Sequence, residues 1–165
     1  PLLYNLAELQ NDCSKYFKIS PDETLRIVQE LYEKKMTTYP RTDARVLSTA
    51  VAKEIHKNIG GLRNYALAAP FAREVLEQGT YKNIAKTRYV NDKQITDHYA
   101  IIPTGQGLNN LAGLAPTAAK VYEVIFKYFL SSGSLSEVLS YIASKGRKLF
   151  CQLQGVDTGR VSEGD

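Results

Sequence analysis

The sequence predicts a mainly α-helical protein, a multi-helix bundle that allows a short strand near its C-terminal end. Two observations support this fold class. Apolar residues recur at spacings of three and four over several long stretches, which is the period of an amphipathic helix. Helix-capping residues precede these stretches, and glycine or proline ends or interrupts them. At 165 residues and 44% hydrophobic composition, the chain can bury one core.

The first two predicted helices each begin with a capping residue. Asn5 is typical of an N-cap, and the apolar positions after it predict a helix that ends near Lys18. Ser20, followed by Pro21 and Glu23, is a stronger start signal for a second helix. The buried face of this second helix is expected to comprise Leu25, Val28, Leu31 and Tyr32.

A third helix is expected over residues 44–58, with Thr42 or Asp43 as its cap and Gly60-Gly61 after its end. The N–H groups of its first turn would point back toward the segment before it, and such groups favour anions. Its apolar stripe would comprise Val46, Leu47, Ala50, Val51 and Ile55.

Further helices are predicted downstream. Residues 62–78 are expected to be helical with an interruption at Pro70, and another helix is expected from Pro116 to about Leu130. A short helix over residues 134–143 and a strand over residues 148–154 complete the predicted elements.

The segment between the second and third predicted helices, residues 36–45, is dense in hydroxyl and guanidinium groups. Pro40 disfavours helical geometry at Tyr39, so the chain should be extended or turning there, with Tyr39, Arg41 and Asp43 on one side. Arginine presents a planar fork that matches phosphate oxygens, and tyrosine can act as a covalent nucleophile once its proton is removed. The segment predicts a phosphate-handling site, and the alternative is a turn with a packed aromatic ring.

A second candidate site is the stretch from residue 80 to residue 97, where helical periodicity fails. Cations suit phosphates and flat rings suit bases, so this mixture is typical of a surface for single-stranded nucleic acid. A solvated loop is the alternative. The basic and aromatic residues concerned are Tyr81, Lys82, Lys86, Arg88, Tyr89 and Lys93.

Composition narrows the function classes. The excess of 21 Lys+Arg over 17 Asp+Glu permits a polyanionic partner without requiring one. Cys13 and Cys151 provide neither metal-ligand spacing nor a disulfide framework, which predicts reduced thiols in a cytoplasmic protein. The sequence has no apolar run of transmembrane length and no signal-peptide pattern, so we expect no membrane partner. A start at Pro1 rather than methionine suggests a fragment of a longer chain.

Three motifs follow the order found in one known family. Residues 29–33, Gln-Glu-Leu-Tyr-Glu, and residues 38–43, Thr-Tyr-Pro-Arg-Thr-Asp, closely resemble the active-site tyrosine signature of type IA DNA topoisomerases. Residues 97–104, Asp-His-Tyr-Ala-Ile-Ile-Pro-Thr, resemble that family's histidine motif, and residues 1–6 are similar to the entry to its tyrosine domain. The tyrosine motif is most similar to that of the bacterial topoisomerase III branch.

The resemblance covers about residues 1–130, which would form a helical active-site tyrosine domain. Residues 131–165 follow the family pattern only weakly. Thr37 stands where the family usually has an aliphatic residue, and Ala44 stands where it usually has a small hydroxyl residue. Neither position is expected to take part in the chemistry.

By this resemblance, the chain is a fragment of an isomerase that changes DNA topology. Tyr39 would attack a phosphodiester in single-stranded DNA to form a 5′-phosphotyrosyl link, Arg41 would stabilise charge on the phosphate, and His98 would contact the same or a neighbouring phosphate. The start of the third helix would hold a DNA phosphate. Further DNA contacts are expected from Thr38, Thr42, Asp43, Arg45, Lys86 and Arg88.

The family also uses magnesium, which a separate domain binds through a glutamate and a cluster of aspartates. This sequence contains no such acidic cluster, so we expect no metal ligand and no cofactor in this chain, and Mg²⁺ in the full-length enzyme. The expected partners are single-stranded DNA and the missing metal-binding domain of the same parent chain. The isolated fragment is expected to be inactive.

Two other functions remain open at this point. The first is a noncatalytic helical module that binds single-stranded nucleic acid, with Tyr39 as a stacking platform and the basic stretch after residue 80 as its support. The second is a helical interaction domain that does not bind nucleic acid.

Overall fold

The computed structural model describes residues 2–131, and most of these residues lie in helices. The mainly α-helical fold class is confirmed for this part of the chain. Within it, extended segments pair only through isolated bridges. The α-helices are α1 Leu6–Phe17, α2 Pro21–Glu33, α3 Thr49–Lys53, α4 Ile55–Gly61, α5 Ala69–Gln78 and α6 Pro116–Ser131. The 3₁₀ helices are η1 Leu62–Asn64, η2 Thr80–Lys86, η3 Asp92–Gln94 and η4 Leu108–Gly113. The helix predicted at 134–143 and the strand at 148–154 lie outside the described residues.

The capping signals of α1 and α2 are confirmed. The Asn5 side chain accepts a hydrogen bond from the Glu8 N–H at 2.8 Å, and the Ser20 hydroxyl accepts one from the Glu23 N–H at 3.1 Å. The buried face of α2 is rotated from the predicted one, because Tyr32 is 39% exposed. The side chains that α2 buries are Thr24, Ile27, Val28 and Leu31.

The predicted single helix over residues 44–58 was wrong at its start and in its continuity: it divides at Glu54 into α3 and α4, and Gly60 and Gly61 lie inside α4. Helix α3 begins only at Thr49, where the Ser48 hydroxyl caps it and the Asp92 carboxylate accepts hydrogen bonds from Thr49. These bonds hold the pKa of Asp92 below its ordinary value. Thr42 and Asp43 therefore do not cap this helix, and α3 cannot hold a phosphate beside Tyr39 in the predicted way.

Long-range hydrogen bonds explain why residues 44–47 are not helical. The Arg45 carbonyl accepts from the Leu3 N–H at 3.0 Å, and the Val46 carbonyl accepts from the Ala100 N–H at 3.0 Å. The Leu47 N–H donates to the Tyr89 carbonyl at 2.7 Å. Backbone groups committed to distant segments cannot also form the ladder of a helix.

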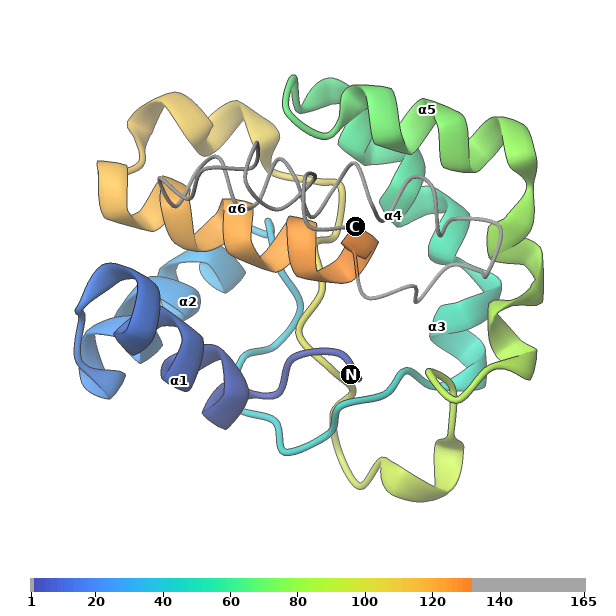
Figure 1. Ribbon diagram of the computed structural model, residues 1–165, viewed down its shortest axis with the longest axis horizontal. Coiled ribbons are helices and arrows are strands. Elements are labelled where there is room, and N and C mark those ends of the chain that lie inside the picture. Colours follow the sequence, from blue (N-terminus) through green and yellow to red (C-terminus); the bar gives the residue numbers. More distant parts are fainter. Residues whose placement is uncertain (1, 132–165) are drawn as a thin grey trace, which may run out of the picture.

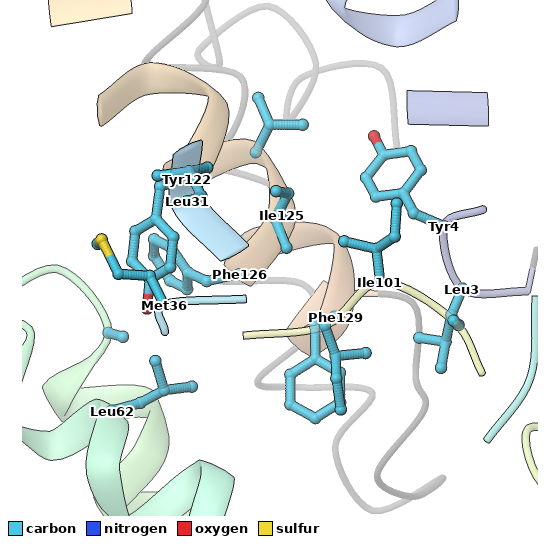
Figure 2. Packing of buried hydrophobic residues seen from close by; sticks show 14 of the residues in the cluster. Leu3, Tyr4, Leu31, Met36, Leu62, Ile101, Tyr122, Ile125, Phe126 and Phe129 are labelled. Atoms are coloured by element: carbon cyan, nitrogen blue, oxygen red, sulfur yellow. The ribbon is translucent and has the colours of Figure 1, made fainter. Parts of the chain in front are cut away.

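Helix α6 is the centre of the core and packs against α1 and α2. Figure 1 shows it running across the molecule between these two helices and the pair α4–α5. On its other side, the Tyr65 ring, which follows η1, packs on Tyr122 and Phe126, with centroids 5.3 and 5.0 Å apart. Burying each large apolar side chain contributes about 1.5–3 kcal/mol. Figure 2 labels Leu3, Tyr4, Leu31, Met36, Leu62, Ile101, Tyr122, Ile125, Phe126 and Phe129 in this core.

Two glycines allow the loop after residue 103 to lie directly on α4. A Cβ atom on Gly61 would lie 2.1 Å from the Gly105 carbonyl oxygen, a distance that no real contact tolerates. Gly105 has φ +80°, and a Cβ there would lie 2.5 Å from the Asn58 carbonyl oxygen. The Asn58 amide also donates to the Pro103 carbonyl at 3.0 Å. The loop is therefore fixed against α4 by close backbone contact.

Replacing Gly61 is expected to destabilise the protein. Gly61→Ala must push the loop away from α4, and overpacking of this kind costs typically about 1–3 kcal/mol. Gly60→Ala is the matched control, because a Cβ at Gly60 meets only the end of the Arg63 side chain, at 3.8 Å. The control should leave the free energy of unfolding unchanged or raise it by up to about 1 kcal/mol, the helix preference of alanine over glycine. Urea unfolding followed by circular dichroism measures both, and equal stabilities for the two variants would contradict the close contact.

Candidate active site

Two segments far apart in the sequence lie side by side and form the frame of the site (Figure 1). The Thr38 N–H donates to the Ile102 carbonyl at 3.1 Å, and the Thr104 N–H donates to the Met36 carbonyl at 3.0 Å. Between these bonds, Thr37 and Pro103 form an antiparallel bridge. This pairing places Tyr39, the residue after Thr38, beside the residues that precede Ile102.

Two hydroxyl groups strengthen the pairing. The Thr38 hydroxyl donates to the Ala100 carbonyl and accepts from the Ile102 N–H, both at 2.9 Å. The Thr42 hydroxyl donates to the His98 carbonyl at 3.3 Å. Both threonines were predicted as DNA contacts, and the structure places their hydroxyl groups in bonds that hold the two segments together.

The Tyr39 ring lies between two other rings. Its centroid is 4.1 Å from that of His98, at an interplanar angle of 33°. The Tyr32 ring meets it edge to face, with centroids 5.2 Å apart. Tyr39 is half-buried, and His98 is exposed. The structure therefore brings together the phenol and the imidazole that the sequence motifs suggested as partners.

A cavity of about 550 Å³ opens beside these rings. This is the size of a small-molecule site. Its wall contains three phenols, from Tyr32, Tyr39 and Tyr99, and a single carboxylate, from Glu33. The other lining residues are Lys35, Thr37, Thr38, His98, Thr104 and Gln106. We call this space the Tyr39 cavity.

Arg41 lies outside the lining of the Tyr39 cavity. Side-chain exposure alternates in this segment, as expected for extended backbone: the even-numbered residues from 38 to 42 are buried, and the odd-numbered ones from 39 to 43 are half-buried or exposed. The Thr42 N–H donates to the Pro40 carbonyl at 2.9 Å, which places Arg41 at the tip of a tight turn. Among the described residues, its guanidinium group forms no hydrogen bond or ion pair.

The other predicted DNA-contact residues lie in different surroundings. Arg45 is half-buried, and its guanidinium group donates to the Leu3 carbonyl at 2.9 Å and to the Tyr128 hydroxyl at 3.4 Å. It therefore ties the N-terminal segment to α6. Asp43, Lys86 and Arg88 are exposed, and none of them lines the Tyr39 cavity.

The structure adds cavity residues that the sequence motifs did not single out. Lys35 follows α2 with φ +64°, and the Met36 N–H donates back to the Leu31 carbonyl at 2.9 Å. This left-handed turn ends the helix and directs the chain into the Tyr39 segment. Glycine usually fills such a position, so a lysine there does not signal the left-handed turn. Tyr99 could have been found from its place next to His98 in the histidine motif.

Several other phenols are structural. Burial raises the pKa of Tyr4, Tyr65 and Tyr122 well above the ordinary tyrosine value, and the Tyr4 hydroxyl also donates to the Asp12 carboxylate. Burial likewise raises the pKa of the Cys13 thiol to about 12. These groups are therefore kept protonated at neutral pH and are poor nucleophiles.

The described residues hold no group of three or more His, Cys, Asp or Glu side chains close enough to bind a metal ion. None of the helices in this part of the chain has the length and apolar character needed to span a membrane.

The Thr38 hydroxyl is expected to contribute to stability through its two hydrogen bonds. Thr38→Val leaves the buried Ala100 carbonyl and Ile102 N–H without this partner, at a cost of roughly 1–3 kcal/mol. Thr37→Val is the matched control, because Thr37 is 2% exposed and its hydroxyl has no hydrogen-bond partner among the described residues. Its free energy of unfolding should be unchanged or slightly higher. Chemical denaturation of the two variants tests this difference. An equal loss of unfolding free energy in both would rule out a contribution from the hydrogen bonds of the Thr38 hydroxyl.

Comparisons with known proteins identify the family of this chain. Residues 1–145 match the DNA topoisomerase family. The chain is 41% identical over 132 residues to DNA topoisomerase 3 of Bacillus licheniformis, and the match covers 79% of this chain and 18% of that protein. It is 39% identical over 132 residues to DNA topoisomerase 3 of Bacillus subtilis, with the same coverage. The chain thus spans less than a fifth of the length of these relatives. It belongs to the DNA topoisomerase family, in its type IA, topoisomerase III-like branch.

Proposed function

We propose that this chain provides the nucleophilic tyrosine of a DNA topoisomerase that cleaves and rejoins single-stranded DNA through a 5′-phosphotyrosine intermediate. The observation that carries the proposal is the packing of the Tyr39 ring on His98 at the edge of an open cavity. The names of the relatives support the same activity.

The reaction is a pair of transesterifications. The Tyr39 oxygen attacks the phosphorus of a phosphodiester, a new phosphorus–oxygen bond forms, and the bond to the 3′-oxygen breaks. The phenol loses its proton, and the departing 3′-oxygen gains one. After a second strand has passed through the gap, the 3′-hydroxyl attacks the phosphotyrosine, and Tyr39 leaves with its proton restored. Each step exchanges one phosphate ester for another, so no external energy source is consumed.

Arg41 and His98 are the groups in this chain that would handle the phosphate. Arg41 lies two residues from the nucleophile at the tip of an exposed turn, where its fork of donors is free to meet phosphate oxygens. His98 holds the face of the Tyr39 ring and can donate a hydrogen bond to the same phosphate. Lys86 and Arg88, which are exposed, would contact DNA further from the reaction.

The described residues do not fit a magnesium ion. Mg²⁺ prefers several oxygen ligands in octahedral geometry, and Glu33 is the single carboxylate in the lining of the Tyr39 cavity. We therefore assign any metal, and the group that protonates the leaving oxygen, to a part of the enzyme outside these residues. On this proposal, the 165-residue chain binds single-stranded DNA but does not complete cleavage and rejoining alone.

The alternative function is a noncatalytic module for single-stranded nucleic acid. The three tyrosine rings in the wall of the Tyr39 cavity favour it, because bases stack on such rings without any covalent step. In that case the Tyr39 ring matters and its hydroxyl group does not. Binding would then tolerate Tyr39→Phe and be weakened by Tyr39→Ala.

Removing the Tyr39 hydroxyl is expected to abolish covalent DNA adducts. The experiment uses a polypeptide that contains this chain together with the metal-binding domain, a labelled single-stranded oligonucleotide, and a denaturing gel. Tyr39→Phe keeps the ring and its contacts, so the fold should remain, but no nucleophile is left. Tyr32→Phe is the matched control, since it removes another phenol from the same cavity. Adducts that persist in Tyr39→Phe, or that vanish equally in both variants, would refute the assignment.

Loss of the His98 imidazole is expected to slow cleavage. A positioned side chain that moves a proton or stabilises phosphate charge typically contributes roughly 10²-fold or more. His98→Ala should therefore lower the single-turnover cleavage rate by about that factor. Asp97→Ala, a change at the neighbouring exposed residue outside the cavity lining, should leave the rate near that of the wild type. Equal rates for the two variants would remove His98 from the mechanism.

A further inference from the structure

A second cavity continues the Tyr39 cavity toward α3 and α4. It has a volume of about 340 Å³, and its far wall includes Val51, Glu54 and Lys57. The two cavities share four wall residues, so they are adjoining parts of one groove. The shared residues are Thr38, Tyr99, Thr104 and Gln106. We call the second part the α4 arm.

The charges in the α4 arm cancel. The Lys57 ammonium group forms an ion pair with the Glu54 carboxylate, and these are the charged side chains in its lining. A phosphate would find no unpaired cation there, and moving it out of water without one is unfavourable. The remaining wall is formed by the half-buried Tyr99 ring, small apolar groups, threonine hydroxyls and side-chain amides. These groups suit a flat, neutral ligand with polar edges, which describes a nucleobase.

Gln106 stands where the α4 arm meets the Tyr39 cavity, and its backbone is fixed. The Gln106 N–H donates to the Thr104 hydroxyl at 3.0 Å, and that hydroxyl donates to the Lys35 carbonyl at 2.6 Å. Gly105 before it lies against α4, and a Cβ on Gly107 after it would lie 2.2 Å from the Lys34 carbonyl oxygen. The loop is therefore held between α4 and the end of α2.

The Gln106 side chain, in contrast, is exposed, and its amide forms no hydrogen bond within the described residues. A glutamine amide presents a donor and an acceptor side by side, which matches an adenine edge with two hydrogen bonds. Tyr99 provides a ring face at the same junction. The loop, held by these contacts, thus places the Gln106 amide next to the Tyr99 ring, on which a base can stack.

We propose that the α4 arm binds the base of a nucleotide adjacent to the phosphate that Tyr39 attacks, with Tyr99 stacking on the base and Gln106 recognising its edge. This inference rests on the proposed function, which it extends to the choice of cleavage site. Adenine is the base that the Gln106 amide favours. Gln106 is then a specificity-determining residue, and it takes no part in the covalent steps.

Cleavage-site mapping tests the proposal. The polypeptide with the metal-binding domain is given single-stranded oligonucleotides that vary in the nucleotides around the cleaved bond, and the adducts are sequenced. The wild type should prefer adenine at one position by at least about fivefold, the lower bound for a bidentate base contact. Gln106→Ala should erase this preference while total adduct formation through Tyr39 persists. Gln94→Ala changes an exposed glutamine in η3 outside both cavities, and this variant should keep the adenine preference.

A second measurement does not depend on cleavage. Titration of the 165-residue chain with an oligothymidylate that contains one adenine should show tighter binding than with oligothymidylate alone, and Gln106→Ala should remove the difference. Tyr99→Phe, which keeps the ring, should retain the difference in affinity between the two oligonucleotides.

The proposal is overturned if Gln106→Ala and Gln94→Ala give the same distribution of cleavage sites as the wild type. Failure of the proposed function itself gives a different result, namely adducts that survive Tyr39→Phe.

Discussion

The hydrogen-bonded pairing of residues 36–38 with residues 100–104 is the constraint on which the site depends. The Thr38 hydroxyl bonds two backbone groups of the second segment, and two backbone bonds, Thr38 N–H to Ile102 and Thr104 N–H to Met36, also join the two segments. Since Tyr39 follows the first segment directly and His98 precedes the second, fixing this register also fixes the two rings against each other. The buried position of these bonds raises the cost of breaking them, because a free N–H or C=O would have no water to replace its partner.

The surrounding helices hold this pair of segments in place from several sides. Helix α2 ends in a left-handed turn at Lys35 that directs the chain into the Tyr39 segment. Helix α4 meets the loop of the second segment at the close contact between Gly61 and Gly105. Helix α6 supplies the core beneath them (Figure 2). The walls of the Tyr39 cavity and its α4 arm are therefore held by these contacts, whereas the Arg41 side chain is exposed at the tip of a tight turn.

Local signals predicted part of this structure. Helices α1, α2 and α6 follow from caps and periodicity, which depend on neighbouring residues alone. Residues 44–47 were expected to be helical and are not, because Leu3, Tyr89 and Ala100 take up their backbone groups. Arg45 was predicted as a DNA contact, and nothing in the sequence indicated that its guanidinium group binds the Leu3 carbonyl and the Tyr128 hydroxyl. Only the family motifs suggested that Tyr39 and His98 meet, and nothing in the sequence indicated the α4 arm, which depends on backbone contacts between distant glycines.

On the proposed function, the Tyr39 oxygen forms the bond to DNA, and two other phenols in the same cavity are its competitors. The most direct test is to trap the DNA adduct of the active polypeptide, digest both components, and locate the linked residue by tandem mass spectrometry. We expect a phosphotyrosine at Tyr39, joined to the 5′ end of the cleaved strand. A link at Tyr32 or Tyr99, or a link to the 3′ end, would contradict it.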